Sequence, residues 1–283
     1  MAAEGFNSRD AAAARDRIVE AARAAGRIAL AHFTAGQRTP ARIDYKVGGS
    51  PVTEADLAVD AFLKAELGGA FPDAAWLSEE TEDDASRLSR SRLLIVDPID
   101  GTRAFIDGDP RWSVSIALVV AGRPAAGVVH APALNETYAA AARLGAALNG
   151  RGVAVSKRPR LDGARIGGPR AMIEAIERVA GLSFALQPKI PSLAYRIALV
   201  ASGALDVALA SDKAHDWDIA AADLILAEAG GALVDADGKA LKYNREETLH
   251  PVLLAAPRKL IGPFVAAAAL VEAGRNPKVA SGA

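Results

Sequence analysis

The chain has 283 residues, of which 51% are apolar and 24% charged, and its formal net charge is −1. This composition can bury a large core, in one large domain or in two packed subdomains. The interspersed charges provide no basic stripe for a nucleic-acid polymer and no polybasic membrane anchor, and no apolar run is long enough to span a bilayer.

Cysteine is absent, which excludes a disulfide, a thiolate nucleophile and a sulfur-ligated zinc site. The first residues lack the apolar segment of a secretory signal. Both observations fit a reducing compartment, so we expect a cytoplasmic protein.

The first third of the chain predicts two helices with a short strand and a loop between them. Apolar residues at helical spacing indicate a long helix over residues 10–35. Residues 42–46 suggest a short strand and residues 47–51 a loop. Thr53 is typical of a helix N-cap and Asp56 falls in the first turn, near the positive end of that helix.

The most informative stretch is an apolar run that ends in two carboxylates. Residues 93–96 read as a buried strand, and Asp97-Pro98-Ile99-Asp100-Gly101-Thr102 follows at once. Two rigidly held carboxylates are the hard oxygen ligands that Mg²⁺ prefers, and backbone N–H groups at the start of a helix would favour an anion beside the cation. The stretch therefore predicts a metal site next to a phosphate site.

The remainder of the chain predicts strands followed by alternating strands and helices. Strands are expected at residues 113–120, 125–130 and 137–142, and a subdomain boundary near residues 150–152. After that, strands and helices alternate, as in an α/β half: residues 165–167, a helix from 170, a helix over 192–201, a strand over 205–210, a helix over 219–229 capped by Asp218, strands over 232–234 and 252–255, and a helix over 260–271.

Three motifs resemble the inositol monophosphatase superfamily of Mg²⁺-dependent, Li⁺-sensitive phosphatases. They are Leu77-Ser78-Glu79-Glu80, then Asp97 to Thr102, then Trp217-Asp218-Ile219-Ala220-Ala221 running into Gly230-Gly231. The order and spacing of all three motifs indicate the superfamily far more specifically than any one motif alone. The resemblance covers most of the chain.

The resemblance implies roles for individual residues. Two or three Mg²⁺ ions would be held by Glu79, Asp97, Asp100, Asp218 and the carbonyl of Ile99, while Asp56 and Thr102, with Glu79, would orient and activate the attacking water. The phosphate would lie against Asp100, Gly101, Thr102, Arg103 and Asp218. Further candidates for the site are Lys46, Glu80 and Lys213.

The resemblance also implies the fold and leaves the oligomeric state open. The expected architecture is the α/β (α+β) class, a layered α/β/α/β/α sandwich of the sugar-phosphatase type. Residues 1–150 would form an α+β half with most metal ligands, and residues 151–283 an α/β half with Asp218 and substrate contacts. Many relatives are dimers, so a homodimer is compatible.

Several residues have simpler structural explanations. Asp97 and Asp100 alternatively cap a turn, and Asp218 is chemically sufficient as an N-cap alone. Glu79 and Glu80 belong to an acidic run of the kind that is usually a solvated face. The four histidines lack metal-ligand spacing and are expected to be structural, with His215 the exception to watch.

The metal ligands do not discriminate among substrates of the superfamily. Residues 103–106, Arg-Ala-Phe-Ile, look more like bacterial bisphosphate nucleotidases than inositol enzymes, and residues 211–213 lack the glutamate that inositol enzymes place before the Trp-Asp motif. Lys213, Arg103 or Arg196 would then meet a second phosphate. The first hypothesis is a 3'(2'),5'-bisphosphate nucleotidase acting on adenosine 3',5'-bisphosphate. Inositol-1-phosphate or histidinol phosphate is the alternative substrate, and a catalytically silent nucleotide- or metal-sensing module is the non-enzyme alternative.

Overall fold

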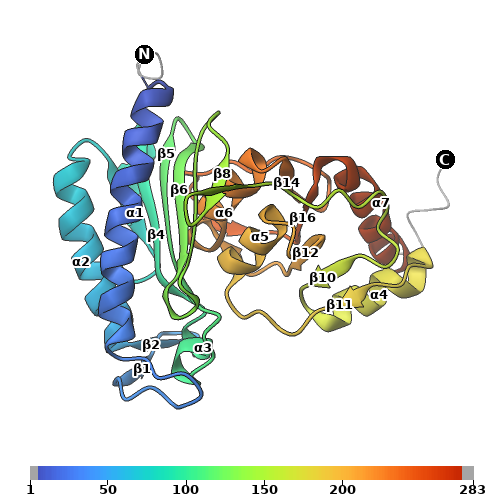
Figure 1. Ribbon diagram of the computed structural model, residues 1–283, viewed down its shortest axis with the longest axis horizontal. Coiled ribbons are helices and arrows are strands. Elements are labelled where there is room, and N and C mark those ends of the chain that lie inside the picture. Colours follow the sequence, from blue (N-terminus) through green and yellow to red (C-terminus); the bar gives the residue numbers. More distant parts are fainter. Residues whose placement is uncertain (1–5, 276–283) are drawn as a thin grey trace.

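Five layers of helices and sheets make up the computed structural model, which describes the backbone of residues 6–275 and the side chains of residues 6–271. Helices α1 and α2 cover one face of a seven-stranded sheet, α5 and α6 lie between it and a five-stranded sheet, and α4 and α7 cover the far side (Figure 1). The α/β/α/β/α sandwich expected from the sequence is confirmed. The helices are α1 Ser8–Leu30, α2 Glu54–Ala70, α3 Thr102–Ile106, α4 Arg170–Ala180, α5 Leu193–Ala201, α6 Asp216–Glu228 and α7 Arg258–Arg275.

The larger sheet has the strand order β3-β4-β5-β6-β7-β8-β9. Only the β3–β4 pair is parallel, and the other neighbours are antiparallel. The strands are β3 Ala75–Ser78, β4 Arg92–Asp100, β5 Ser113–Val120, β6 Arg123–Ala131, β7 Glu136–Ala141, β8 Ala146–Leu148 and β9 Arg151–Val153. The strand predicted at residues 113–120 is confirmed with the same bounds.

The smaller sheet has the order β11-β10-β12-β16-β14 and mixes parallel and antiparallel pairs. Its strands are β10 Arg165–Gly167, β11 Ala185–Leu186, β12 Val207–Ala210, β14 Gly231–Asp235 and β16 Leu253–Pro257. Two small two-stranded antiparallel sheets and two 3₁₀ helices complete the described part of the fold: β1 Ile43–Tyr45 with β2 Pro51–Thr53, β13 Ala214–His215 with β15 Leu249–His250, η1 Ala85–Ser89 and η2 Pro132–Leu134.

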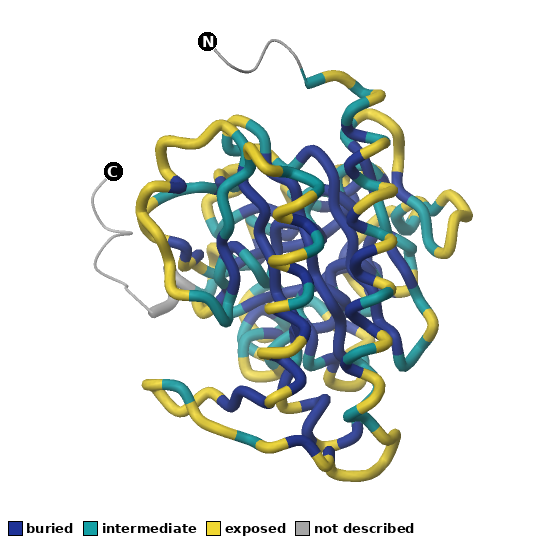
Figure 2. Tube along the Cα trace, turned by 90° about the vertical axis from the view of Figure 1, so that its left-hand side faces the viewer, coloured by how far each residue is buried: buried dark blue, intermediate teal, exposed yellow. Residues whose placement is uncertain are grey.

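Burial on both faces explains why the central strands are continuous apolar runs rather than alternating ones. In β4, Leu94 and Val96 pack under α1 and α2, whereas Leu93 and Ile95 pack against the α5–α6 layer. The strands at the centre of the molecule are accordingly among its most deeply buried segments (Figure 2). At its carboxyl end, β4 runs from this core directly into the polar motif, Asp97 to Thr102.

Helix ends differ from the sequence-based bounds where tertiary contacts decide them. The first helix ends at Leu30 rather than near residue 35, where the chain turns back toward the end of α3 and the turn after it. Gly36 N donates to the carbonyl of Gly108, and Thr39 N to that of Ile106. Helix α2 continues through Gly68 and Gly69 and ends at Ala70, two residues before Pro72.

The division into halves near residue 150 stays a prediction. The larger sheet continues to Val153 and the smaller one begins at Arg165. No helix in residues 6–275 combines the length and apolar character needed to cross a membrane.

Candidate metal and phosphate site

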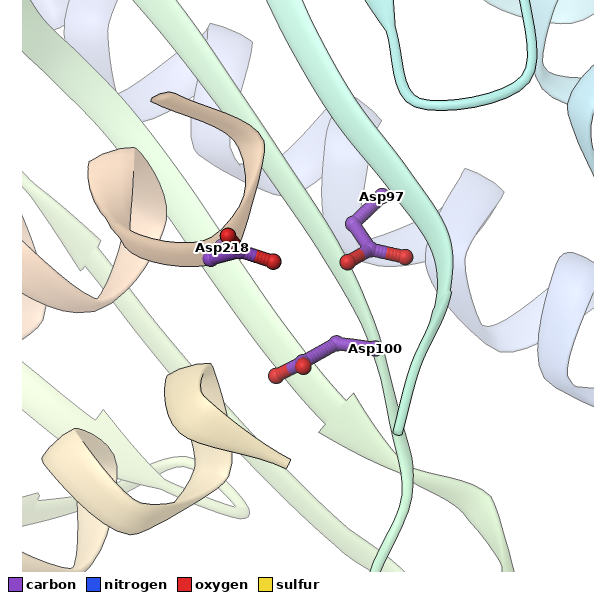
Figure 3. Close-up of side chains that lie close together, drawn as sticks. All are labelled: Asp97, Asp100 and Asp218. Atoms are coloured by element: carbon purple, nitrogen blue, oxygen red, sulfur yellow. The ribbon is translucent and has the colours of Figure 1, made fainter. Parts of the chain in front are cut away.

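Three carboxylates converge where the end of β4 meets the start of α6. Asp97, Asp100 and Asp218 each offer one oxygen, and these oxygens all lie within 4.8 Å of one another (Figure 3). The first two come from the larger sheet and the third from a helix more than a hundred residues later. The structure thus brings together the central predicted ligands from distant parts of the sequence.

A bulge at the end of β4 explains how two residues three apart face the same way. Successive strand residues point to opposite faces, so residues i and i+3 of a regular strand would diverge. Asp97 pairs with Ser115 and Asp100 with Ser113, which leaves one extra residue on β4 between these pairs. The insertion turns both carboxylates toward one site.

Asp97 is the strongest indication of a bound cation. Asp97 is 1% exposed, and neither of its carboxylate oxygens has a hydrogen-bond partner among the described residues. Burial raises its pKa well above the ordinary value, and the nearby charges of Glu79, Asp100 and Asp218 raise it further. An unpaired buried carboxylate is costly, and a hard divalent cation would satisfy its oxygens. The donor set therefore fits Mg²⁺ or a similar ion.

Asp100 is held by the first turn of α5. Its Oδ2 accepts from the Ser192 hydroxyl at 2.5 Å and from Ala194 N at 2.7 Å, and its Oδ1 from Leu193 N at 3.2 Å. Burial raises the pKa of Asp100 to about 6, although these hydrogen bonds oppose the shift. From the sequence, Ser192 is recognisable only as a helix start, since no local pattern links it to Asp100.

Asp218 lies in the first turn of α6 rather than at its cap. The helix begins at Asp216 with His215 as the N-cap, so the predicted capping role of Asp218 is wrong in position. Its Oδ2 instead accepts from His215 N at 2.6 Å, the return bond of a capping box. Burial, then the charge of Asp100, raises the pKa of Asp218 well above the ordinary value.

His215 contributes to this helix start through packing. Its ring stacks on Trp217 with 4.6 Å between the ring centroids, and Nδ1 lies 2.9 Å from the Thr248 hydroxyl. These contacts give a packing role to His215, the histidine that the sequence left as an exception.

Asp56 and Thr102 meet as the resemblance implies. The Thr102 hydroxyl lies 3.3 Å from Asp56 Oδ1 and 3.2 Å from the carbonyl of Ile99, and both oxygens are acceptors. Thr53 is the predicted N-cap of α2, and its backbone N–H and hydroxyl both donate to Asp56 Oδ2. Burial raises the pKa of Asp56 to about 6 despite these bonds.

Lys46 bridges the two glutamates of the Leu-Ser-Glu-Glu motif. Its Nζ lies 2.8 Å from Glu79 Oε1 and 2.7 Å from Glu80 Oε1. Burial raises the pKa of Glu80 to about 7, while Lys46 opposes the shift. Glu79 is outside the group of three converging carboxylates but near enough for its charge to raise the pKa of Asp97.

The predicted phosphate contacts differ in how they are placed. Gly101 has φ of 95°, a conformation that favours glycine, and caps α3, which is only five residues long. Thr102 is buried at the site, whereas Arg103 and Lys213 are exposed. Their roles toward substrate stay predictions.

Comparisons with known proteins agree with this geometry. The sequence model of the inositol monophosphatase family matches residues 11–273. A histidinol-phosphatase of Mycobacterium tuberculosis is 38% identical over 222 residues, 70% of this chain and 79% of the relative. The 3'(2'),5'-bisphosphate nucleotidase CysQ of Haemophilus influenzae is 33% identical over 215 residues, 73% and 80% of the two chains.

Solved structures show the same fold. The Thermotoga maritima IMPase TM1415 superposes with a TM-score of 0.77 at 30% identity, covering 92% of this chain and 98% of that one. The extragenic suppressor protein suhB of Bartonella henselae gives 0.78 at 28% identity, covering 90% and 98%.

Fold, site and sequence define a phosphoric monoester hydrolase, a class that acts on small phosphorylated substrates. The chain belongs to the inositol monophosphatase family, which is metal-dependent. The resemblance inferred from the three motifs is confirmed, and the reading as a catalytically silent module is not supported.

Proposed function

We propose that this chain is a Mg²⁺-dependent phosphomonoesterase that binds two or three ions through Asp97, Asp100, Asp218, Glu79 and the carbonyl of Ile99. The observation that carries the proposal is the buried, unpartnered carboxylate of Asp97 beside two further carboxylates. Bound there, Mg²⁺ would neutralise phosphoryl oxygens and lower the pKa of a coordinated water. Glu79 would exchange part of its contact with Lys46 for the cation.

Asp56 and Thr102 orient the attacking water in this proposal. The Thr102 hydroxyl has two oxygen acceptors in reach, Asp56 Oδ1 and the Ile99 carbonyl. A hydroxyl that donates to either one keeps its own lone pairs free to accept a hydrogen bond from the water. Asp56 is in turn fixed by Thr53, so the pair is held before substrate arrives.

The substrate proposed first is adenosine 3',5'-bisphosphate, hydrolysed to AMP and phosphate. Support comes from the Arg103-Ala104-Phe105-Ile106 segment and from the similarity to CysQ proteins. Histidinol phosphate and inositol-1-phosphate are the alternatives, supported by relatives of 38% and 34% identity named for these activities. A cytoplasmic location, a homodimer and sensitivity to lithium stay predictions.

A substrate panel tests the proposal. Phosphate release is measured from adenosine 3',5'-bisphosphate, inositol-1-phosphate and histidinol phosphate at equal protein and Mg²⁺, with Asp97→Asn as the matched control. We expect turnover that needs Mg²⁺, is highest for the bisphosphate and is lost in the variant. A clear preference for another substrate would overturn the proposed ranking of substrates. Retained turnover in Asp97→Asn would overturn the assignment of Asp97 as a metal ligand.

A further inference from the structure

Asp60 is a buried carboxylate on α2, one helical turn beyond Asp56. Residues four apart share one face of a helix, so Asp60 lies on the same side of α2 as the residue proposed to orient the water. Asp60 is 7% exposed. Its Oδ1 accepts from the Ser78 hydroxyl at 2.5 Å and its Oδ2 from the Thr81 hydroxyl at 2.7 Å. Both carboxylate oxygens thus bind one short segment of chain.

This segment, residues 78–81, carries the two glutamates of the Leu-Ser-Glu-Glu motif between its two hydroxyl residues. Strand β3 ends at Ser78, and the next residues form a bend that is neither helix nor strand. The backbone around Glu79 therefore lacks the regular hydrogen bonds that fix a ligand within a helix or a sheet. Other contacts have to hold the bend if Glu79 is to keep one orientation.

Contacts from two sides hold this bend in place. On one side, Glu79 N donates at 3.3 Å to the carbonyl of Val96, which immediately precedes the polar motif of β4. On the other side, Asp60 binds both ends of the bend. The Ser78 hydroxyl also accepts from Glu80 N at 3.3 Å, which ties the backbone between the two glutamates to the same carboxylate.

Both hydroxyl groups have further partners that direct their hydrogens to Asp60. Trp76 Nε1 donates to the Thr81 hydroxyl oxygen at 3.3 Å, and Glu80 N donates to that of Ser78. A hydroxyl has one hydrogen and two lone pairs, so each group accepts one bond and gives its hydrogen to the carboxylate. An amide in place of Asp60 would offer a single acceptor oxygen to these two donors.

We propose that Asp60 is a positioning residue of the metal site, which fixes the bend so that the Glu79 side chain reaches the cation bound by the three aspartates. The inference rests on the proposed metal-dependent function and adds a residue that touches neither metal nor substrate. Groups that orient a metal ligand in this way contribute about 10- to 100-fold to metal affinity or activity. Helix α2 then serves the site twice, through Asp56 and through Asp60.

Calorimetric titration of Mg²⁺ into metal-free protein tests this role without substrate. Asp60→Ala removes both acceptors, and its affinity for Mg²⁺ is expected to fall by about 10- to 100-fold. Asp60→Asn keeps one acceptor oxygen and should lose less affinity than Asp60→Ala. Wild-type affinity in folded Asp60→Ala protein would overturn the proposal.

Asp206→Asn is the matched control for a general loss of stability. Asp206 is also buried, and it accepts from Arg165 Nε at 3.1 Å and Nη2 at 2.9 Å. It lies directly before β12, whereas α6 and the metal site follow the other end of that strand. Its Tm should fall while its Mg²⁺ affinity stays that of wild type. Equal losses of affinity in Asp206→Asn and Asp60→Asn would reflect stability alone and contradict the proposal.

Thr81→Val and Ser78→Ala cover the case in which Asp60→Ala does not fold. Each variant removes one donor to Asp60 and leaves the carboxylate itself in place. Each is expected to weaken Mg²⁺ binding by about 2- to 10-fold, the contribution of one hydrogen bond. Unchanged affinity in both folded variants would overturn the proposal.

The Mg²⁺ dependence of turnover separates an effect through Glu79 from one through Asp56 on the same helix. If Asp60 acts through Glu79, phosphate release by Asp60→Asn recovers as the Mg²⁺ concentration is raised. A loss of kcat that persists at saturating Mg²⁺, together with wild-type Mg²⁺ affinity, would mean that Asp56 has moved instead. That result would overturn the proposal.

The same titration of Asp97→Asn protein separates this inference from the proposed function. Weak Mg²⁺ binding in Asp97→Asn, with wild-type binding in Asp60→Ala, would overturn the inference and leave the metal site standing. Wild-type binding in Asp97→Asn would overturn the proposed metal site and the inference with it. We expect both variants to bind Mg²⁺ more weakly than wild type.

Discussion

The hydroxyl of Ser192 donates to Asp100 Oδ2 at 2.5 Å, across the junction between the larger sheet and the α5–α6 layer. The two residues are 92 positions apart in sequence. Ser192 is also the N-cap of α5, where its oxygen accepts from Tyr195 N at 3.0 Å. One side chain thus starts a helix and fixes the orientation of a proposed metal ligand.

Substitution Ser192→Ala is expected to weaken both functions. Loss of an N-cap costs about 1 kcal/mol of unfolding free energy, and loss of a bond that orients a ligand lowers metal affinity by roughly tenfold or more. Urea unfolding and the Mg²⁺ dependence of phosphate release measure the two effects. Ser202→Ala, at the other end of α5, is the control and should leave the Mg²⁺ requirement alone. An unchanged requirement in Ser192→Ala would contradict a role in orienting Asp100.

Asp97→Asn is expected to raise the stability of metal-free protein while abolishing its response to Mg²⁺. Burial and neighbouring carboxylates raise the pKa of Asp97, so its charged form is unfavourable without a cation. The neutral isostere removes this penalty, and each kcal/mol gained raises Tm by about 2–4 °C for a chain of this size. Thermal unfolding is recorded with EDTA and with Mg²⁺.

The control for this prediction is Asp237→Asn, which replaces an exposed carboxylate in the turn after β14. Its Tm should rise with Mg²⁺ as in wild type. If Asp97→Asn melted below wild type in EDTA and still gained stability from Mg²⁺, Asp97 would be a structural residue rather than a ligand.

Local sequence patterns predicted those elements that local physics determines. Thr53 with Asp56 three residues later is a complete capping box, and the structure contains both of its bonds. The strand at residues 113–120 contains an uninterrupted apolar run over residues 116–120. Neither needed information from elsewhere in the chain.

The remainder depends on tertiary contacts that no local pattern contains. The bulge between Asp97 and Asp100 follows from pairing with β5, and the contact of Ser192 with Asp100 joins distant segments. Lys46, which directly follows β1, reaches Glu79 across 33 positions of sequence and Glu80 across 34. The family resemblance indicated the expected metal ligands, but only the fold showed which other residues hold those ligands in place.

His130 is expected to make stability fall in mild acid. Burial lowers the pKa of His130 to about 4, with Nδ1 held by the Thr137 hydroxyl and the Glu136 carbonyl. The unfolded chain takes up the proton near pH 6.5 and the folded chain only near 4, so stability is lost as pH falls through this window. The full loss is about 3 kcal/mol.

The variant His130→Gln removes this proton uptake. Its unfolding free energy, measured in urea from pH 7 to pH 4, should fall less steeply than that of wild type. His32→Gln, at a more exposed histidine, should follow the wild-type slope. Parallel curves for wild type and His130→Gln would show that His130 does not carry the acid sensitivity.

Replacing two helical glycines by alanine is expected to change stability in opposite directions. At Gly26 in α1, a Cβ would lie 2.8 Å from the His130 ring and from Pro132 Cγ, so Gly26→Ala forces the helix away from β6. The expected loss is about 1–2 kcal/mol after the gain in helix propensity. At Gly68 in α2, a Cβ would have no neighbour within 4 Å among the described residues beyond its own stretch of helix, and Gly68→Ala should stabilise by up to about 1 kcal/mol. Equal effects in urea unfolding would contradict the packing shown here.

The buried pair of Asp216 and His250 is expected to hold the start of α6 in place. His250 Nε2 lies 2.6 Å from Asp216 Oδ1, and Asp216 N donates to the Thr248 carbonyl at 3.0 Å. Asp216 is 0% exposed. His250→Ala leaves a buried carboxyl without this partner, which costs about 3–5 kcal/mol where that carboxyl is charged. Because Asp218 is two residues along the same turn, turnover should fall as well.

A double-mutant cycle distinguishes the pair from general damage to the fold. If the contact itself is what matters, adding Asp216→Ala to His250→Ala should cost less than Asp216→Ala costs alone, with a coupling of about 1–3 kcal/mol. Additive losses in unfolding free energy would mean that the two side chains act independently. If the double variant regains stability but not turnover, the pair sets the position of Asp218 and does not merely fill the core.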